Sequence, residues 1–209
     1  MSADPRQPLS MIRSFTAADA LTIGNASCGT VCVFLCLDFM AFGDERRIWI
    51  AIAMLPLAFV FDALDGHVAR LTRTRQSLLG ADLDSLSDVI SFGVAPAALG
   101  YTLGLRGGWD MVCLVYFVVC GVSRLARFNV TASSLTDTGT GKVKYFEGTP
   151  IPTSIVIAGL LAIALWAGHV QNDIWFGAYR IGPALLHPLV LVYVLSGSAM
   201  ISTIRIPKP

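Results

Sequence analysis

The sequence predicts an all-α, polytopic membrane protein with six transmembrane helices. Of its 209 residues, 55% are hydrophobic and only 14% are charged, and the mean hydropathy is +0.67. A soluble domain typically has about a quarter of its residues charged. Apolar segments are spread along the whole chain, which favours one membrane domain over residues 16–209. The polar segment before it, 1–15, is expected to form a short interfacial helix.

Six windows approach the roughly 20 apolar residues that a bilayer-spanning helix needs. In chain order they are 18–41, 47–70, 79–104, 110–130, 150–169 and 181–201. The long connection 131–149 is rich in Ser, Thr and Gly and is expected to be a loop. Lys and Arg residues gather in the N-terminal segment, the second and fourth connections and the C-terminus. Basic residues favour the cytoplasmic side, so both termini are predicted to be cytoplasmic.

Several reactive residue types in these windows are expected to have structural roles. Cys28, Cys32 and Cys36 recur every four residues, but no His or fourth Cys completes a zinc set, so they are predicted to pack as small apolar residues. Asp110 is expected near the outer surface of the membrane, and His187 is expected to mark a kink in the last span. The net charge of +1 does not indicate a nucleic-acid partner.

Four aspartates inside apolar windows indicate a metal site. An ionised Asp at the centre of a membrane helix costs roughly 2.5–3.5 kcal/mol, so a compensating partner is required. Asp62 and Asp65 share one helix face, as do Asp84 and Asp88 on the next helix. A short connection makes these helices antiparallel, and the two faces can meet near the cytoplasmic side. Hard carboxylate ligands suit Mg²⁺, Mn²⁺ or Ca²⁺, and four are enough for two ions.

Small residues and one cation accompany the aspartates. Gly66 and Gly80 have no side chain, so a large ligand can lie against the helix backbone there. Ala69 shares the face of Gly66, and its small side chain keeps that face free of bulky groups. Arg70 can pair with phosphate oxygens. Together with the carboxylates, this pattern predicts a nucleoside diphosphate site that opens to the cytoplasm.

The spacing of these residues resembles the signature of a known family. The string DALDGHVAR at 62–70, followed by GADLDSLSD at 80–88, matches the pattern D-x-x-D-G-x-x-A-R…G-x-x-x-D-x-x-x-D of the CDP-alcohol phosphotransferases. Four further stretches are similar to the phosphatidylserine synthase branch: ALTIGNASCG at 20–29, SFGVAPA at 91–97, CGVSRLARFN at 120–129 and YFEGTPIPTS at 145–154. The resemblance covers about 16–200.

This resemblance implies a six-helix enzyme that displaces CMP from CDP-diacylglycerol with the hydroxyl of L-serine, within the lipid of the membrane. It implies that Asp62, Asp65, Asp84 and Asp88 hold two divalent cations, Mg²⁺ or Mn²⁺, and that Asp88 is also the general base. The CDP pocket would comprise Asp62, Gly66, Ala69, Arg70 and Gly80. A homodimer is expected from the resemblance alone.

Serine recognition is predicted at the cytoplasmic end of the fourth span. Arg124 and Arg127 are spaced i, i+3 on a helix, with Phe128 and Asn129 next to them. Two guanidinium groups can clamp a carboxylate. The competing interpretation is that these arginines only anchor the helix at the cytoplasmic surface.

Three alternatives to this function remain open at the level of sequence. The acceptor is glycerol 3-phosphate or inositol phosphate in the first, and the donor is an archaeal ether lipid in the second. The third, from a different class, is a divalent-cation or proton transporter that uses the same aspartates. Transporters often have paired repeats, whereas all four aspartates here belong to one helix pair. Direct attack is expected rather than a covalent intermediate, because no Ser, Cys or His with a partnering base lies among the aspartates.

Overall fold

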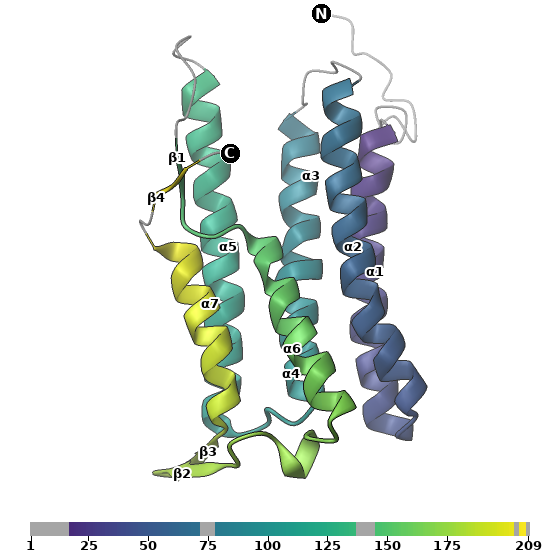
Figure 1. The fold of residues 1–209 in the computed structure, drawn as a ribbon. Coiled ribbons are helices and arrows are strands. Elements are labelled where there is room, and N and C mark those ends of the chain that lie inside the picture. Colours follow the sequence, from purple (N-terminus) through teal and green to yellow (C-terminus); the bar gives the residue numbers. More distant parts are fainter. Residues whose placement is uncertain (1–16, 72–77, 137–144, 203–204, 208–209) are drawn as a thin grey trace, which may run out of the picture.

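The computed structural model describes residues 17–71, 78–136, 145–202 and 205–207, and it is mostly helical (Figure 1). The three longest helices are α1 (Ala17–Phe42), α2 (Glu45–Leu71) and α5 (Gly108–Thr136). Their segments Ala18–Phe42, Glu45–Val68 and Gly108–Val130 are each long and apolar enough to cross a membrane. The chain is therefore an integral membrane protein with three candidate spans among the described residues.

The third predicted span is a continuous helical rod with a π-helical turn at its middle. It comprises α3 (Leu78–Asp88), the π turn Val89–Val94 and α4 (Ala95–Thr102). The N–H of Ala95 donates to the carbonyl of Ile90, five residues back. Pro96 follows, and it has no N–H to continue the regular α-helical ladder. The predicted span 79–104 is therefore mostly helical but not uniformly α-helical, because a π turn begins directly after Asp88.

The last two helices are shorter than their predicted windows. A 3-10 turn, Ile151–Ser154, leads into α6 (Ile155–Trp166), and another, Pro188–Val190, leads into α7 (Leu191–Ile201). The residues before α7 form an antiparallel hairpin of β2 (Tyr179–Ile181) and β3 (Ala184–Leu186). Gly182, with a φ of +61°, and Pro183 make its turn, so a helix starting at 181 was a wrong prediction.

A second strand pair lies at the end of the bundle where α1 begins (Figure 1). It joins β1 (Tyr145–Glu147) to β4 (Arg205–Pro207) in antiparallel register. The predicted loop 131–149 therefore contains the end of α5 and this short strand, with 137–144 outside the described residues. The prediction of a helical architecture is correct, and the described residues add four strands of three residues each to it.

Asp110 and His187 join the hairpin to α5. Asp110 is fully buried, and its carboxylate accepts hydrogen bonds from the backbone N–H groups of Gly107 and His187, at 2.7 and 2.8 Å, and faces the His187 Nδ1 at 2.5 Å. That Asp110 lies near the outer surface of the membrane stays a prediction, whereas the predicted kink was wrong, because His187 precedes the last helix. An Asp with three partners can be buried in this way.

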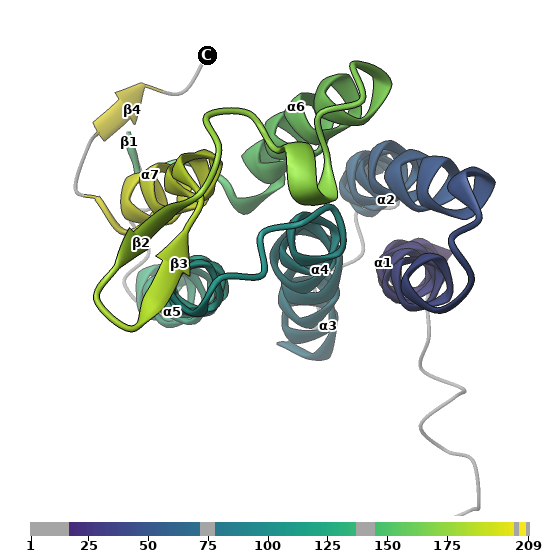
Figure 2. The same ribbon diagram turned by 90° about the horizontal axis from the view of Figure 1, so that it is seen from below.

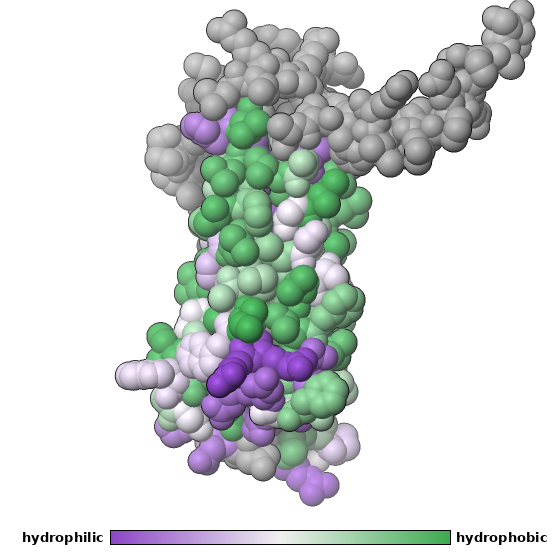
Figure 3. All heavy atoms as spheres, turned by 90° about the vertical axis from the view of Figure 1, so that its right-hand side faces the viewer, coloured by the Kyte–Doolittle hydropathy of each residue, from purple (hydrophilic) through white to green (hydrophobic). Residues whose placement is uncertain are grey.

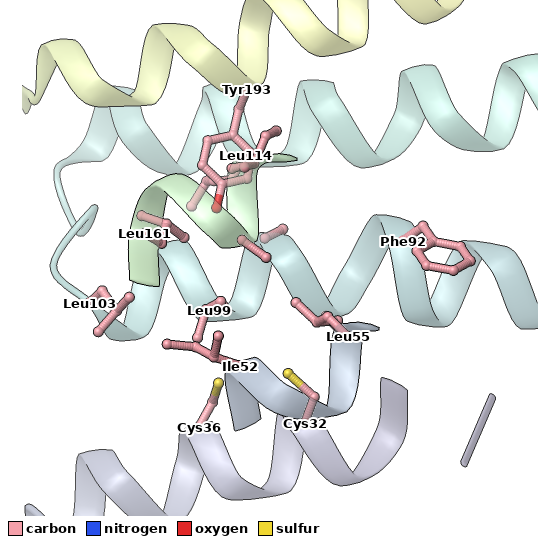
Figure 4. Close-up of a cluster of buried hydrophobic side chains, with 14 of the residues drawn as sticks. Cys32, Cys36, Ile52, Leu55, Phe92, Leu99, Leu103, Leu114, Leu161 and Tyr193 are labelled. Atoms are coloured by element: carbon pink, nitrogen blue, oxygen red, sulfur yellow. The ribbon is translucent and has the colours of Figure 1, made fainter. Parts of the chain in front are cut away.

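The core runs through the middle of the bundle, where α4 lies between α2 and α5 in the view from below (Figure 2). Figure 4 shows side chains from α1, α2, α4, α5, α6 and α7 meeting there: Cys32, Cys36, Ile52, Leu55, Leu99, Leu103, Leu114, Leu161 and Tyr193. The Tyr193 hydroxyl donates to the Pro96 carbonyl at 2.7 Å, and its ring packs edge-on against Phe117. Cys28 is buried as well, so the packing role predicted for these cysteines is confirmed.

The outer surface of the bundle is strongly apolar. Figure 3, which faces α1 and α2, shows a broad hydrophobic band with a hydrophilic patch near one end. The turn between α1 and α2 lies at that end, and Arg47 there forms an ion pair with Asp38. Large apolar side chains such as Phe34 and Leu195 are 61% and 70% exposed. A surface of this kind suits lipid rather than water.

One close contact fixes α1 against the π turn, and it supports a stability prediction. A Cβ on Gly29 would lie 2.5 Å from Ser91 Oγ and 2.7 Å from Ser91 Cα. Because the second atom belongs to the backbone, Gly29→Ala is expected to push the helices apart and to destabilise the protein by about 1–3 kcal/mol. Thermal unfolding in detergent measures this. Gly159→Ala on α6 is the control, because a Cβ there meets no atom within 4 Å; equal melting temperatures for both variants would contradict the prediction.

Candidate active site

Three of the four predicted aspartates meet between α2 and α3. One carboxylate oxygen from each of Asp62, Asp84 and Asp88 lies within 4.8 Å of the other two. Asp88 is buried, and Asp62 and Asp84 are half-buried. Asp62 comes from the last turns of α2, whereas Asp84 and Asp88 are one turn apart on α3. The i, i+4 spacing puts Asp84 and Asp88 on one face of α3, and their carboxylates meet that of Asp62 on α2.

Asp65 lies outside this group of three. It is buried, and its Oδ2 accepts a hydrogen bond from the Thr22 hydroxyl of α1 at 2.8 Å. It still interacts electrostatically with Asp62 and Asp84. The fourth aspartate is thus close to the cluster, but its side chain is held by α1.

A second residue of α1, Asn25, contacts the cluster directly. Its Nδ2 donates to Asp88 Oδ1 at 3.2 Å, and the whole residue is buried. Its main-chain carbonyl accepts a hydrogen bond from Ser91 Oγ of the π turn at 2.8 Å. Sequence reasoning assigned no role to Thr22 or Asn25. The available signal was two polar residues, three positions apart, inside an apolar window.

The three clustered aspartates fit a hard divalent cation. Every donor in the set is a carboxylate oxygen, which is the ligand type that Mg²⁺ and Mn²⁺ accept. Asp84 Oδ1 is buried and has no hydrogen-bond partner among the described residues. Three carboxylates this close together repel one another unless positive charge compensates them. The arrangement can therefore hold a divalent cation, as the sequence predicted for these aspartates.

The glycine of the motif on α2 borders open space. A Cβ on Gly66 would meet no atom of the described residues within 4 Å, so this side of α2 has room for a ligand. Gly80 lies half-buried near the start of α3. Ala69 and Arg70 belong to the last turn of α2, but their side chains, like residues 72–77, lie outside what the structure describes.

Arg124, which was predicted to bind serine, lies beside the aspartates. It is half-buried on α5 and interacts electrostatically with Asp88. Its Nε is buried without a hydrogen-bond partner among the described residues. Arg127 and Phe128 are exposed. Asn129 instead links α5 to α3, because its Oδ1 accepts from Ser85 Oγ at 3.1 Å.

Comparison with known proteins places the chain in a family. A family model described as CDP-alcohol phosphatidyltransferase matches residues 15–200. The CDP-diacylglycerol--serine O-phosphatidyltransferase of Saccharomyces cerevisiae is 43% identical over 203 residues, which cover 96% of this chain and 73% of that protein. The protein of the same name from Methanocaldococcus jannaschii is 39% identical over 75% of this chain and 63% of its own length. The archaetidylserine synthase of Methanothermobacter thermautotrophicus is 41% identical over 69% of this chain and 57% of its own length. The chain belongs to the CDP-alcohol phosphatidyltransferase family.

Proposed function

We propose that this protein transfers a phosphatidyl group from CDP-diacylglycerol to the hydroxyl of L-serine, giving phosphatidylserine and CMP. The observation that carries the proposal is the convergence of Asp62, Asp84 and Asp88 from two helices, within 4.8 Å of one another and beside Arg124. The family and the names of its relatives in yeast and archaea support the same reaction. CMP release from CDP-diacylglycerol that depends on added serine tests it.

Different residues of the motif are proposed to bind the cations and the CDP group of the donor. Asp62, Asp84 and Asp88, with Asp65 nearby, would hold two divalent cations, Mg²⁺ or Mn²⁺. When bound, such ions neutralise pyrophosphate charge and make CMP a better leaving group. The open space at Gly66 gives the nucleotide access to the backbone of α2. Asp62, Ala69, Arg70 and Gly80 complete the proposed CDP pocket.

Asp88 is the proposed general base. A serine hydroxyl is a weak nucleophile, so a base within hydrogen-bonding reach must accept its proton. The serine oxygen then forms a bond to the phosphorus that carries the lipid. The pyrophosphate P–O bond breaks, and CMP leaves with that bond's electron pair. Asp88 suits this role because it is buried, and because Asn25 fixes one of its oxygens at 3.2 Å. We propose direct displacement, since the described cluster consists of carboxylates alone.

Arg124 is proposed to bind the serine carboxylate, with Arg127, Phe128 and Asn129 completing the acceptor site. Arg124→Ala is expected to raise the KM for serine by about 10-fold or more, since a charge-assisted hydrogen bond is lost. The KM for CDP-diacylglycerol should change far less. Arg127→Ala should have the smaller effect, because that side chain is exposed. Steady-state kinetics with each substrate varied in turn measure this, and a larger rise in the KM for the lipid would refute the assignment.

We further propose that the bundle crosses the membrane six times. The crossings would be α1, α2, the rod from α3 to α4, α5, α6 and α7, with both termini and the aspartates on the cytoplasmic side. The distribution of Lys and Arg supports this orientation. Labelling of single cysteines introduced near Leu71 and Gly43 in intact cells tests it, because only the second should react from outside. A homodimer is proposed from family resemblance, and light scattering in detergent measures it.

One relative favours a second donor. The archaetidylserine synthase is similar to 69% of this chain, which supports an ether-lipid donor as an alternative to a diacyl one. Supplying the CDP derivatives of both lipids with serine distinguishes them.

A further inference from the structure

Asn25 of α1 has a hydrogen-bonding group that the fold itself leaves unused. An ionised carboxylate only accepts hydrogen bonds, so the NH₂ group of Asn25 must face Asp88. The amide oxygen, Oδ1, then lies on the other side of the amide group. This oxygen is buried and has no partner among the described residues. Because an unpaired buried carbonyl is unfavourable, a donor from a bound molecule is expected to complete it.

The backbone around Asn25 is held in place. Ser91 Oγ donates to the Asn25 carbonyl at 2.8 Å, and Gly29 lies so close to Ser91 that a Cβ would overlap it. The position of α1 against the π turn is thus fixed by contacts on the same face as Asn25. The unpaired oxygen is therefore pre-organised, which lowers the entropy lost when a ligand binds.

Arg124 of α5 has a hydrogen-bonding group that complements the Asn25 oxygen. Its Nε–H is a buried donor without a partner among the described residues, and its charge interacts with Asp88. Among the described residues beside Asp88 there is thus an unpaired acceptor on α1 and an unpaired cationic donor on α5. A molecule that satisfies both carries an N–H donor and an anionic group. If Asp88 takes its proton, it also carries a hydroxyl. A 2-amino-3-hydroxy acid has all three.

We propose that Asn25 determines specificity for the amino group of the acceptor. Its Oδ1 accepts a hydrogen bond from the ammonium of L-serine, Arg124 faces the carboxylate, and Asp88 faces the hydroxyl. This inference rests on the proposed function. The competing role for Oδ1 is that of a cation ligand. The geometry favours the ammonium, because it is the Nδ2 end of the amide, and not Oδ1, that contacts the carboxylate cluster.

The test compares two acceptors in variants of the purified full chain. L-serine and 3-hydroxypropanoate, which is serine without its amino group, are each supplied with CDP-diacylglycerol and Mn²⁺, and kcat/KM is measured as CMP release. We expect wild-type protein to prefer serine. In Asn25→Leu, which has a similar volume but no polar atom, this preference should fall by about 10-fold or more. The ratio of two acceptors cancels any loss that is common to both, such as a displaced Asp88.

Asn25→Asp provides the second arm of the test. It keeps an oxygen acceptor but loses the donor to Asp88, so kcat should fall for both acceptors while the preference for serine is retained. Asn25→Ala carries the same expectation as Asn25→Leu and replaces it if that variant does not fold. Ser27→Ala is the control on α1, because the Ser27 hydroxyl is exposed and bonds only the Ile23 carbonyl among the described groups. Both the rate and the preference of this control should equal those of wild type.

An unchanged preference for serine in both Asn25→Leu and Asn25→Ala would overturn the inference while leaving the proposed function intact. If these variants also needed a higher Mn²⁺ concentration for half-maximal activity, Oδ1 would be a cation ligand instead. If wild-type protein released no CMP in response to serine, the proposed function itself would fail, and the inference with it.

Discussion

Asp88→Asn is expected to slow CMP release by about 10²- to 10⁴-fold, which is the usual contribution of a general base. An amide of nearly the same size cannot accept the serine proton at neutral pH, and it is a poorer ligand for a hard cation. Asp88 is buried, and its side chain is held by a hydrogen bond from Asn25. Single-turnover CMP release with excess enzyme measures the chemical step directly.

The matched control for this variant is Asp44→Asn. Asp44 is an exposed aspartate at the α1–α2 turn, and its Oδ1 accepts a hydrogen bond from the backbone N–H of Arg46, which an Asn side chain can also satisfy. Its activity should stay within about twofold of wild type. Both variants should elute as single species in size-exclusion chromatography. More than a tenth of wild-type activity in folded Asp88→Asn would rule out Asp88 as the base.

Excess EDTA is expected to abolish activity, and added Mg²⁺ or Mn²⁺ should restore it. The cluster of Asp62, Asp84 and Asp88 consists of three carboxylates, and one of the oxygens of Asp84 has no partner among the described groups. Without positive charge, these groups repel one another and leave the pyrophosphate uncompensated. Activity that persists in excess chelator would contradict the metal assignment.

Thermal unfolding gives a measure of cation binding that does not depend on turnover. A ligand that binds only the folded state stabilises it, so Mn²⁺ at 100 times its Kd should add about 2.7 kcal/mol to the free energy of unfolding. The rise in melting temperature should be lost in Asp84→Asn. If Mn²⁺ stabilised this variant as much as wild type, the ion would bind elsewhere.

The convergence of the carboxylates was predictable from sequence, because it depends on local spacing. Asp84 and Asp88 are one helical turn apart, and a short connection makes α3 antiparallel to α2. The partners supplied by α1 could not be predicted in this way. Thr22 and Asn25 lie 43 and 63 residues from Asp65 and Asp88 in the chain, and their contacts depend on how three helices pack. Helical periodicity gives the face of a residue but not its neighbour on another helix.

Departures from regular helix were missed for a related reason. Pro96 and Gly182–Pro183 are visible as breaker signals, but the apolar residues around them dominated the prediction of long spans. In the structure, Pro96 directly follows a π turn that begins after Asp88, and Gly182–Pro183 form the turn of a hairpin. π turns often occur at functional sites. Here the turn brings Ser91 to α1, where it fixes the backbone of Asn25.

The most direct test of the proposed reaction is CMP release by the purified protein from CDP-diacylglycerol with Mn²⁺. L-serine, glycerol 3-phosphate and inositol phosphate are offered separately, with Asp88→Asn as the inactive control. We expect release with serine alone, and none from the control. Release with a phosphorylated acceptor, or with no acceptor dependence at all, would contradict serine as the substrate, and no release under any condition would contradict the proposed reaction with this donor.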